Sequence, residues 1–389
     1  MENKERALAH VEKIEWIRPI EGADNIELIG VLGWVCIAKK GEFNVGDMAV
    51  YIEIDSKCPE TDERFAFLAN KKFKVKTMKL GKFKVISQGL ALPLSLFPEL
   101  QDKKIGDDIT EALKITYASE EDAARKTNKI DPNAKYKSMA KRRPKLFANP
   151  IVRRIMRYSI GRKIMFMLFG RKKDNPKKFP DWIIKTDETR IENAPFYLQS
   201  TEKWIKTEKC DGTSCTFAVD RLKKGKNKFD FIVCSRNVRQ ADREQACYHE
   251  SNIYWELADK YDIEKILTQF ATENDYNRVV LQGEGVGSVQ GNPYKFTENK
   301  LFVFNLIIDG TRLGTVKMAD FCKSHGLTSV PIIDTAYELP KTMEEMKLEA
   351  DGYSELNPKV KREGFVYRSI DGQQSFKNVS REYLLKHNG

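Results

Sequence analysis

Residues 207–214 read Thr207-Glu208-Lys209-Cys210-Asp211-Gly212-Thr213-Ser214, and a run of alternating residues follows directly at 215–219. This pattern predicts a strand, an Asp-Gly turn and a second strand, with Lys209 beside the turn. A lysine amine is protonated at neutral pH because its usual pKa is about 10.4. Nearby cations or burial can lower that pKa and make the amine a nucleophile. The motif is short, however, and a lysine beside a hairpin turn is usually a solvated residue.

Five short segments downstream support the nucleophile interpretation, because each is a β-type run with one charged or aromatic residue in apolar surroundings. They are residues 235–237, 281–285, 301–305, 362–366 and 375–378. In this order and at this spacing, the set resembles the covalent nucleotidyltransferase superfamily of ATP-dependent ligases and mRNA capping enzymes. The Thr-Ser pair after Lys-Cys-Asp-Gly resembles RNA ligases, whereas DNA ligases usually carry an arginine at the position of Ser214. The resemblance covers about the C-terminal half of the chain.

The resemblance implies that Lys209 attacks the α-phosphate of ATP, expels pyrophosphate and carries AMP on its side chain. Glu208 is then expected to read the adenine edge and Phe304 to stack on the base. Because strand side chains alternate, Phe302 is expected to point the same way as Phe304. Ordinary core packing is the alternative for both phenylalanines.

Four more residues have roles implied by the same resemblance. Arg236 is expected to contact the ribose and the incoming 5′-phosphate, and Glu284 to hold a ribose hydroxyl. Glu363 is expected to help place a divalent metal, Mg²⁺ or Mn²⁺, on the reacting phosphates, and Lys377 to neutralise the α-phosphate in the transition state. The expected nucleotide-binding residues are Glu208, Lys209, Asp211, Gly212, Arg236, Glu284, Phe304 and Lys377, with Lys209, Arg236 and Lys377 catalytic.

The last motif departs from the family pattern. Many relatives have a Lys-x-Lys pair, whereas this chain reads Ser375-Phe376-Lys377. Either Lys377 acts alone, or Lys295 or Arg368 supplies the missing charge. The segment at 179–190 also resembles the family and is expected to open the catalytic domain, with no chemical role assigned to it.

The first hundred residues have short β-type runs separated by glycine-containing turns, which predict a small barrel. The expected strands lie at residues 31–38, 48–54, 73–79, 83–87 and 88–94. This part resembles the N-terminal OB-fold domain of one RNA ligase branch. Lys74, Lys76 and Lys84 alternate with apolar residues on the expected hairpin, so they either contact RNA or form a solvated strand face.

The predicted fold is α+β, with an N-terminal OB-fold β-barrel followed by a nucleotidyltransferase domain of antiparallel sheets flanked by helices. A chain of 389 residues is too long for one ordinary core. The expected divisions are an OB-fold domain at 1–118, a basic linker or insertion with an amphipathic helix at 119–178, and a catalytic domain at 179–389.

The positive charge is local. Residues 121–180 contain 19 Lys and Arg against 4 Asp and Glu, a net charge of +15, whereas the whole chain carries +11. Such a block is either a solvated linker or a stripe that attracts a phosphate backbone. Residues 150–170 have helix-like apolar spacing interrupted by arginines, which fits a basic amphipathic helix on a membrane or on a partner.

Composition disfavours other classes of site. Seven cysteines without a Cys-x-x-Cys pair argue against a disulfide framework and against zinc, and His249, His325 and His387 have no partners at metal-ligand spacing. The first residues lack an apolar signal segment, and no run is long enough to cross a membrane. We therefore expect an intracellular protein, cytoplasmic or, in a eukaryote, nuclear or organellar.

These observations together predict an ATP-dependent RNA ligase that acts as a monomer in RNA repair. Its partner would be RNA with 5′-phosphate and 3′-hydroxyl ends, as in a nicked duplex, and ATP would be the AMP donor. A capping-type guanylyltransferase or a DNA ligase would normally carry a further OB module after the catalytic domain, for which the residues after Lys377 leave no room. A catalytically dead nucleic-acid-binding relative stays open, because fold alone does not establish activity.

Overall fold

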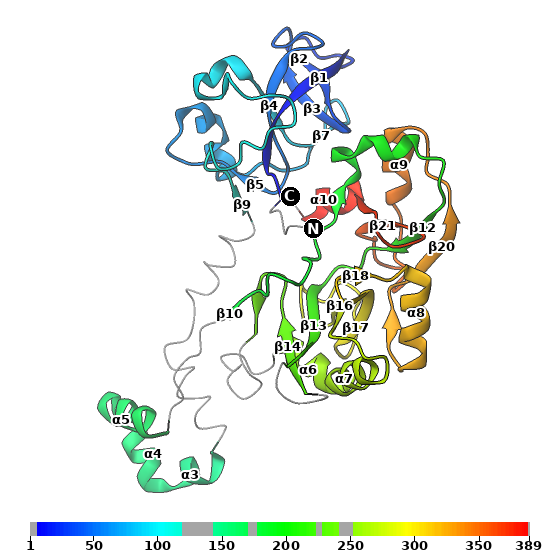
Figure 1. The fold of residues 1–389 in the computed structure, drawn as a ribbon. Coiled ribbons are helices and arrows are strands. Elements are labelled where there is room, and N and C mark those ends of the chain that lie inside the picture. The colour runs from blue at the N-terminus through cyan, green and yellow to red at the C-terminus, as the bar shows by residue number, and fades with distance from the viewer. Residues whose placement is uncertain (1–5, 119–142, 170–176, 223–227, 241–251, 388–389) are drawn as a thin grey trace.

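The computed structural model describes residues 6–118, 143–169, 177–222, 228–240 and 252–387. They form an N-terminal β domain, a larger domain of sheets and helices, and three helices that lie apart from both (Figure 1). The predicted α+β class is therefore confirmed. None of the described helices is both long enough and apolar enough to span a bilayer.

The N-terminal domain is a curled five-stranded sheet. Its strands, in spatial order, are β3 (Trp34–Lys39), β2 (Ile26–Val31), β1 (Ala9–Pro19), β4 (Met48–Ile52) and β8 (Leu90–Pro93). β1 pairs with β4 over its first half and with β2 over its second half, and its register with β2 shifts between Ile14 and Trp16. Such an irregularity lets one strand bend across two partners. The amide of Gln88 donates to the carbonyl of Val35 at 2.8 Å, which brings β3 close to β8 and confirms the small barrel.

Several strand predictions in this domain were inexact. β1 was missed, and the strand expected at 31–38 begins only at Trp34, after a turn in which Leu32 has φ of 52°. The expected hairpin is reduced to β6 (Met78–Leu80) and β7 (Val85–Ser87). Lys74 and Lys76 precede β6, and Lys84 lies in the turn, so the three lysines do not share a strand face. The remaining elements are β5 (Ser56–Lys57), β9 (Thr116–Tyr117), η1 (Glu63–Lys71), η2 (Leu94–Leu96) and η3 (Pro98–Leu100).

The larger domain contains two sheets. The eight-stranded sheet consists of β10 (Lys177–Lys178), β15 (Val238–Arg239), β14 (Phe229–Cys234), β13 (Thr213–Arg221), β16 (Arg278–Val286), β17 (Lys300–Ile308) and β18 (Thr311–Arg312), with β19 (Thr328–Ser329) beside β17. The five-stranded sheet consists of β11 (Thr189–Arg190), β22 (Ser375–Val379), β21 (Gly364–Ser369), β12 (Trp204–Glu208) and β20 (Ile332–Tyr337). Two short helical turns, η4 (Ile191–Asn193) and η5 (Pro195–Gln199), join β11 to β12.

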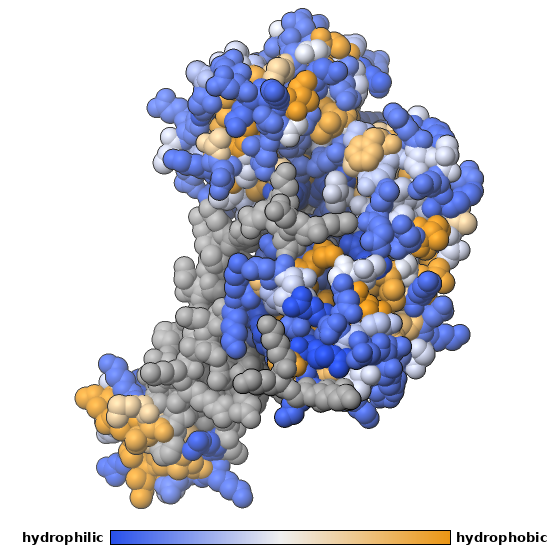
Figure 2. Space-filling view, viewed as in Figure 1, coloured by the Kyte–Doolittle hydropathy of each residue, from blue (hydrophilic) through white to orange (hydrophobic). Residues whose placement is uncertain are grey.

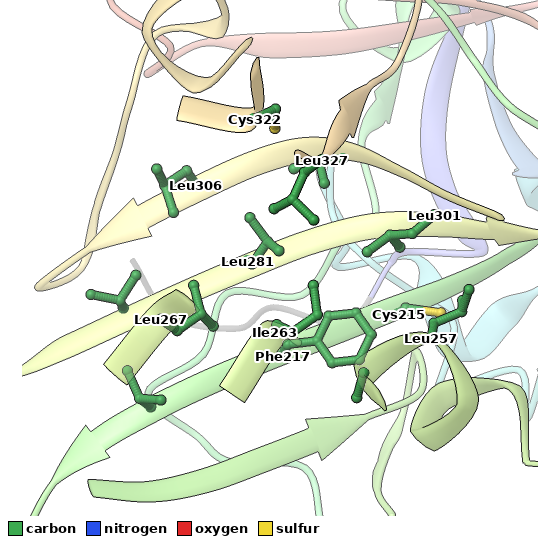
Figure 3. Packing of buried hydrophobic residues seen from close by; sticks show 14 of the residues in the cluster. Cys215, Phe217, Leu257, Ile263, Leu267, Leu281, Leu301, Leu306, Cys322 and Leu327 are labelled. Carbon is green, nitrogen blue, oxygen red and sulfur yellow. The ribbon is translucent and has the colours of Figure 1, made fainter. Parts of the chain in front are cut away.

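Helices cover one face of the eight-stranded sheet. They are α6 (Ile253–Lys260), α7 (Ile263–Glu273) and α8 (Thr315–Ser324). Figure 3 shows Leu257 and Leu267 from the helices facing Phe217 and Leu281 from the strands, all fully buried. Each such side chain contributes about 1.5–3 kcal/mol to folding. The helices thus stabilise the eight-stranded sheet from one face. Two further helices, α9 (Met343–Ala350) and α10 (Arg381–His387), lie near the five-stranded sheet.

The barrel packs directly on the larger domain. The amide of Gly33 donates to the carbonyl of Glu192 at 2.8 Å, and the ammonium of Lys347 donates to the carbonyl of Gly33 at 2.7 Å. A Cβ at position 33 would lie 2.7 Å from the Cα of Glu192, so only glycine allows this approach. Val379 and Leu384 also enter the core of the barrel. Both domains can therefore contribute to one site.

A buried histidine makes the stability of the barrel dependent on pH. His10 Nδ1 lies 2.8 Å from Glu12 and Nε2 lies 3.3 Å from Glu53. Burial lowers the pKa of His10, but the two carboxylates outweigh it and raise the pKa to about 9. Because the folded-state pKa is raised, the stabilisation is complete below about pH 6.5 and is lost as the pH rises through about 9.

We therefore expect the free energy of unfolding to fall by about 2 to 3 kcal/mol between pH 6 and pH 9 through His10 alone. His10→Gln should be less stable at pH 6 and should lose this slope. Urea melts of both proteins at the two pH values measure the effect. Equal slopes in wild type and variant would contradict the assignment.

Candidate active site

A cavity of about 510 Å³ lies where the two sheets and the barrel meet. All the residues that the sequence singled out for nucleotide, metal and catalysis line it: Glu208, Lys209, Asp211, Gly212, Arg236, Glu284, Phe304, Glu363 and Lys377. They come from β12, β16, β17 and β22 and from the segments that follow β12 and β14 and precede β21. The fold thus brings together residues from position 208 to position 377.

Lys209 lies where the chain passes from one sheet to the other. β12 belongs to the five-stranded sheet and β13 to the eight-stranded sheet, so the two strands do not form the hairpin that the Asp-Gly turn suggested. The amide of Lys209 donates to the carbonyl of Gly364 at 3.0 Å. A Cβ on Gly212 would lie 2.4 Å from the carbonyl oxygen of Gly285, which explains the glycine after Asp211. The crossing places the amine between the sheets.

Three carboxylates surround this amine. Lys209 Nζ donates to Glu363 at 2.6 Å, and Glu284 and Asp211 add negative charge nearby. Burial lowers the pKa of Lys209, but the carboxylates together outweigh it, so the pKa is raised above its usual value. Burial was named from the sequence as a means of lowering this pKa, but the acidic residues that the fold gathers act in the opposite direction.

The same crowding raises the pKa values of two of the acids. Burial, with Glu363 and Asp211 as like charges, raises the pKa of Glu284 to about 8. Burial and Glu363 raise the pKa of Asp211 to about 6. Such a group favours an added cation. Within the part of the chain that is described, no three acidic, cysteine or histidine side chains are placed to ligate a metal directly, so a metal here would bind largely through water and phosphate oxygens, as Mg²⁺ prefers.

Two cationic side chains, Lys377 and Arg236, lie at the other end of the cavity. Each donates a hydrogen bond to the carboxylate of Asp187. Lys377 Nζ donates to Asp187 Oδ1 at 2.8 Å, and Arg236 Nη2 donates to Asp187 Oδ2 at 2.9 Å. Burial, together with Arg190, Arg6 and Lys209, outweighs the attraction of Asp187 and lowers the pKa of Lys377 to about 8. Burial opposes ionisation of Asp187, but Lys377 and Arg236 hold its pKa well below the usual range. A carboxylate thus bridges the two groups expected to bind phosphate.

The two residues expected to bind the base, Glu208 and Phe304, both line the cavity. Glu208 is buried, and its carboxylate accepts from Ser354 Oγ and from the amide of Glu355, the latter at 2.7 Å. Phe304 lines the cavity at an irregularity in the β16–β17 register. Phe302 instead is buried beside Phe296, with ring centroids 6.2 Å apart. Phe302 is thus a core residue rather than a second stacking residue.

The two residues considered as substitutes for the missing lysine behave differently. Arg368 lines the cavity, but it donates to Glu188 at 3.0 Å and lies among buried groups. Lys295 does not line the cavity. Arg190 also lines the cavity, and its Nη2 donates to Asp55 at 3.1 Å. Its Nε and Nη1 are buried and have no hydrogen-bond partner among the described residues. Arg190 is therefore a cation that the sequence did not single out.

Sequence reasoning also missed other polar residues of the cavity, among them Arg6, Asp55, Tyr117 and Asp187. The ring of Tyr117 lies 5.7 Å from the guanidinium carbon of Arg236, so the barrel reaches the predicted site. The family-like segment at 179–190 was a signal for Asp187. No local pattern marked the barrel residues, because only the packing of the two domains brings them to the cavity.

Known structures share this architecture along almost the whole chain. Naegleria gruberi RNA ligase with PPi is 31% identical, with a TM-score of 0.75, and the match covers 98% of this chain and 99% of that one. The chain belongs to the RNA ligase family. A mutant of the Naegleria gruberi RNA ligase with ATP and Mn is 30% identical, with a TM-score of 0.74 and 98% of each chain covered. Another mutant, with AMP and Mn, is 30% identical, with a TM-score of 0.74 and coverage of 98% and 99%.

Family models place the two parts of this RNA ligase separately. The model described as RNA ligase matches residues 202–386, and one described as an OB-fold domain matches residues 8–94. No curated protein matches the sequence. The predicted family and the N-terminal OB-fold are confirmed, and neither the capping-enzyme nor the DNA-ligase alternative is favoured.

Proposed function

We propose that this RNA ligase joins RNA 3′-hydroxyl and 5′-phosphate ends through a lysyl-AMP at Lys209. Nζ would attack the α-phosphorus of ATP, the bond to the β-phosphate oxygen would break, and pyrophosphate would leave. The AMP would pass to the RNA 5′-phosphate, and the 3′-hydroxyl would then displace it. The observation that carries this proposal is the position of Lys209 between an acidic cluster and the cations Lys377 and Arg236.

The acidic cluster explains how Lys209 could be controlled. The nucleophile must lose its proton, yet Glu363, Glu284 and Asp211 favour the protonated amine. Their excess charge fits Mg²⁺ or Mn²⁺, which would offset it and stabilise charge on the phosphates. The Naegleria gruberi enzyme has structures with ATP and Mn and with AMP and Mn. With their charge offset by the metal ion, the carboxylates would no longer outweigh the effect of burial, so the pKa of Lys209 would fall.

The cationic end fits the phosphates. Asp187 bridges Lys377 and Arg236, and we propose that phosphate oxygens replace it when ATP binds. Arg6 and the unpaired nitrogens of Arg190 fit the leaving pyrophosphate, since buried guanidinium groups bind such oxygens in pairs. The structure of the Naegleria gruberi enzyme with PPi supports a pyrophosphate position in this family.

Specificity for adenine is proposed to come from Glu208 and Phe304. The carboxylate of Glu208 already accepts two hydrogen bonds, and carboxylate oxygens have further lone pairs for an amino group of the base. Phe304 lies half-buried in the wall of the cavity, where a ring can stack on a base. Glu284 and Arg236 are proposed to contact the ribose.

The choice of nucleotide tests the proposal. Wild-type protein incubated with Mg²⁺ and ATP labelled in the α-phosphate is expected to retain label after denaturation, whereas α-labelled GTP should give none. Label from GTP alone would point to a capping-type transferase. Nicked duplexes should be sealed when the 3′-hydroxyl end is RNA, and sealing that ignores the sugar would favour a DNA ligase.

Several sequence-based expectations remain predictions. These are the domain boundaries at 118 and 178, the nicked-duplex substrate, the monomeric state, the intracellular compartment and the role in RNA repair. Contact of Lys74, Lys76 and Lys84 with RNA is also untested. Unchanged RNA affinity after neutralising all three lysines would remove that hypothesis.

A further inference from the structure

Three consecutive helices form an arm that lies apart from both domains (Figure 1). They are α3 (Pro144–Ala148), α4 (Pro150–Met156) and α5 (Ser159–Phe169). Asn149 caps the N-terminus of α4, and its side chain accepts from the amide of Ile151 at 2.9 Å. Residues 143–169 contain seven arginines and lysines and no acidic residue. The basic stretch predicted from the sequence is thus partly helical, although residues 121–142 and 170–176 lie outside the described chain.

The apolar face of the arm points to solvent. On α5, Ile160, Ile164, Met167 and Leu168 follow the spacing i, i+4, i+7 and i+8 that places side chains on one helix face. These side chains are 48–78% exposed, whereas Met165 on another face is 6% exposed. In a helix of a globular domain, such a stripe would face the core. Figure 2 shows hydrophobic side chains on the surface of this arm, at the lower left.

α4 extends the same pattern and adds charge. Ile151 and Ile155 are exposed one turn apart, and Arg153, Arg154 and Arg157 are exposed between or just after them. α5 contributes Lys163, also exposed, three residues after Ile160 and four before Met167, at the edge of its apolar stripe. The arm therefore presents exposed apolar side chains flanked by cations.

We propose that this arm binds the surface of an anionic lipid bilayer. The apolar side chains would enter the boundary between headgroups and acyl chains, and the arginines and lysines would meet the anionic headgroups. α5 has 11 residues, and a helix needs about 20 to cross the hydrocarbon core, so it would lie in the plane of the interface. The ligase domain would then work beside a membrane.

The combination of groups favours lipid over nucleic acid. An RNA backbone would neutralise the cations but would leave Ile160, Ile164 and Met167 in water. A bilayer surface accommodates both kinds of side chain in one layer. Residues 143–169 contain no acidic side chain, so nothing in this stretch would be repelled by a negatively charged surface.

Vesicle flotation with the full-length protein tests this inference. Wild-type protein is expected to float with vesicles of phosphatidylcholine and phosphatidylglycerol and much less with phosphatidylcholine alone. In the apolar variant, Ile160, Ile164, Met167 and Leu168 are all replaced by serine, and flotation should fall about tenfold although the charge is unchanged. A matched control removes exposed valines elsewhere, Val45→Ser with Val316→Ser, and should float like wild type.

Each contrary result has a definite meaning. Wild type that does not float, or an apolar variant that floats as well as wild type, overturns the proposal. An arm that binds only RNA would show salt-sensitive RNA affinity lost in Arg153→Gln with Arg154→Gln and Arg157→Gln but kept in the apolar variant, without flotation. Self-association would appear as an oligomer that becomes monomeric in the apolar variant, again without flotation. Unchanged thermal melts, together with labelling by ATP, show that the variants fold.

Discussion

Lys209→Ala is expected to abolish adenylylation of the protein, by more than about a thousandfold, because it removes the attacking atom. Among the described residues that line the cavity, the other lysine is Lys377, which is bound to Asp187. Lys209→Arg should be equally inactive, since a guanidinium keeps the charge but cannot be deprotonated. Mass spectrometry after incubation with ATP and Mg²⁺ should find a peptide containing position 209 that is heavier by one AMP in wild type only.

Two controls separate loss of the nucleophile from loss of the fold. Lys203→Ala removes an exposed lysine paired with Glu338, just before β12, and should leave labelling intact. RNA supplied already adenylylated at its 5′ end bypasses the first step, so Lys209→Ala should still seal it at a measurable rate. Label that persists in Lys209→Ala would contradict the assignment. Loss of sealing on the preformed intermediate as well would indicate damage beyond the nucleophile.

Local patterns in the sequence located several of the strands that carry the site but missed β1 of the barrel, and the site residues themselves were assigned through the family resemblance. A strand that buries one face shows alternating apolar and polar residues in the sequence. Lys209, Glu284 and Glu363 each lie in or beside such a run. The same patterns could not show that β12 and β13 belong to different sheets, because an Asp-Gly turn serves a hairpin and a crossing equally well. The place where the chain crosses from one sheet to the other depends on tertiary packing, so local sequence patterns do not predict it.

Electrostatics of the site was the least predictable part. Burial was named from the lysine motif as a means of lowering the pKa, yet the fold gathers Glu284, Glu363 and Asp211 around Lys209, and these carboxylates outweigh burial. The bridging role of Asp187 likewise depends on a contact made across 190 positions of sequence. Phe302 and Phe304 pack in the same cluster, as alternation predicted, but only Phe304 lines the cavity, and no local pattern separates the two.

Lys377 should control the alkaline side of the pH profile. Its pKa is lowered to about 8, mainly by burial, so its positive charge is lost as the pH rises above that value in the free enzyme. Loss of one positioned cation at a phosphate costs about a hundredfold or more in rate. We therefore expect Lys377→Ala to adenylylate about a hundred to a thousand times more slowly at pH 7. Wild-type kcat/KM for ATP should rise with pH as Lys209 loses its proton and should level off above about pH 8, where Lys377 loses its charge.

Replacing Lys377 with arginine tests whether the positive charge at this position, rather than the shape of the lysine side chain, determines the pH profile. A guanidinium stays protonated throughout this range, so kcat/KM of the variant should keep rising to higher pH before it levels off, even if the absolute rate is lower. Lys295→Arg makes the same exchange outside the cavity and should leave the profile unchanged. Because the deprotonated fraction of Lys209 keeps growing over the same range, the levelling off must come from a second group. A profile that is identical in wild type and Lys377→Arg would remove Lys377 as that group.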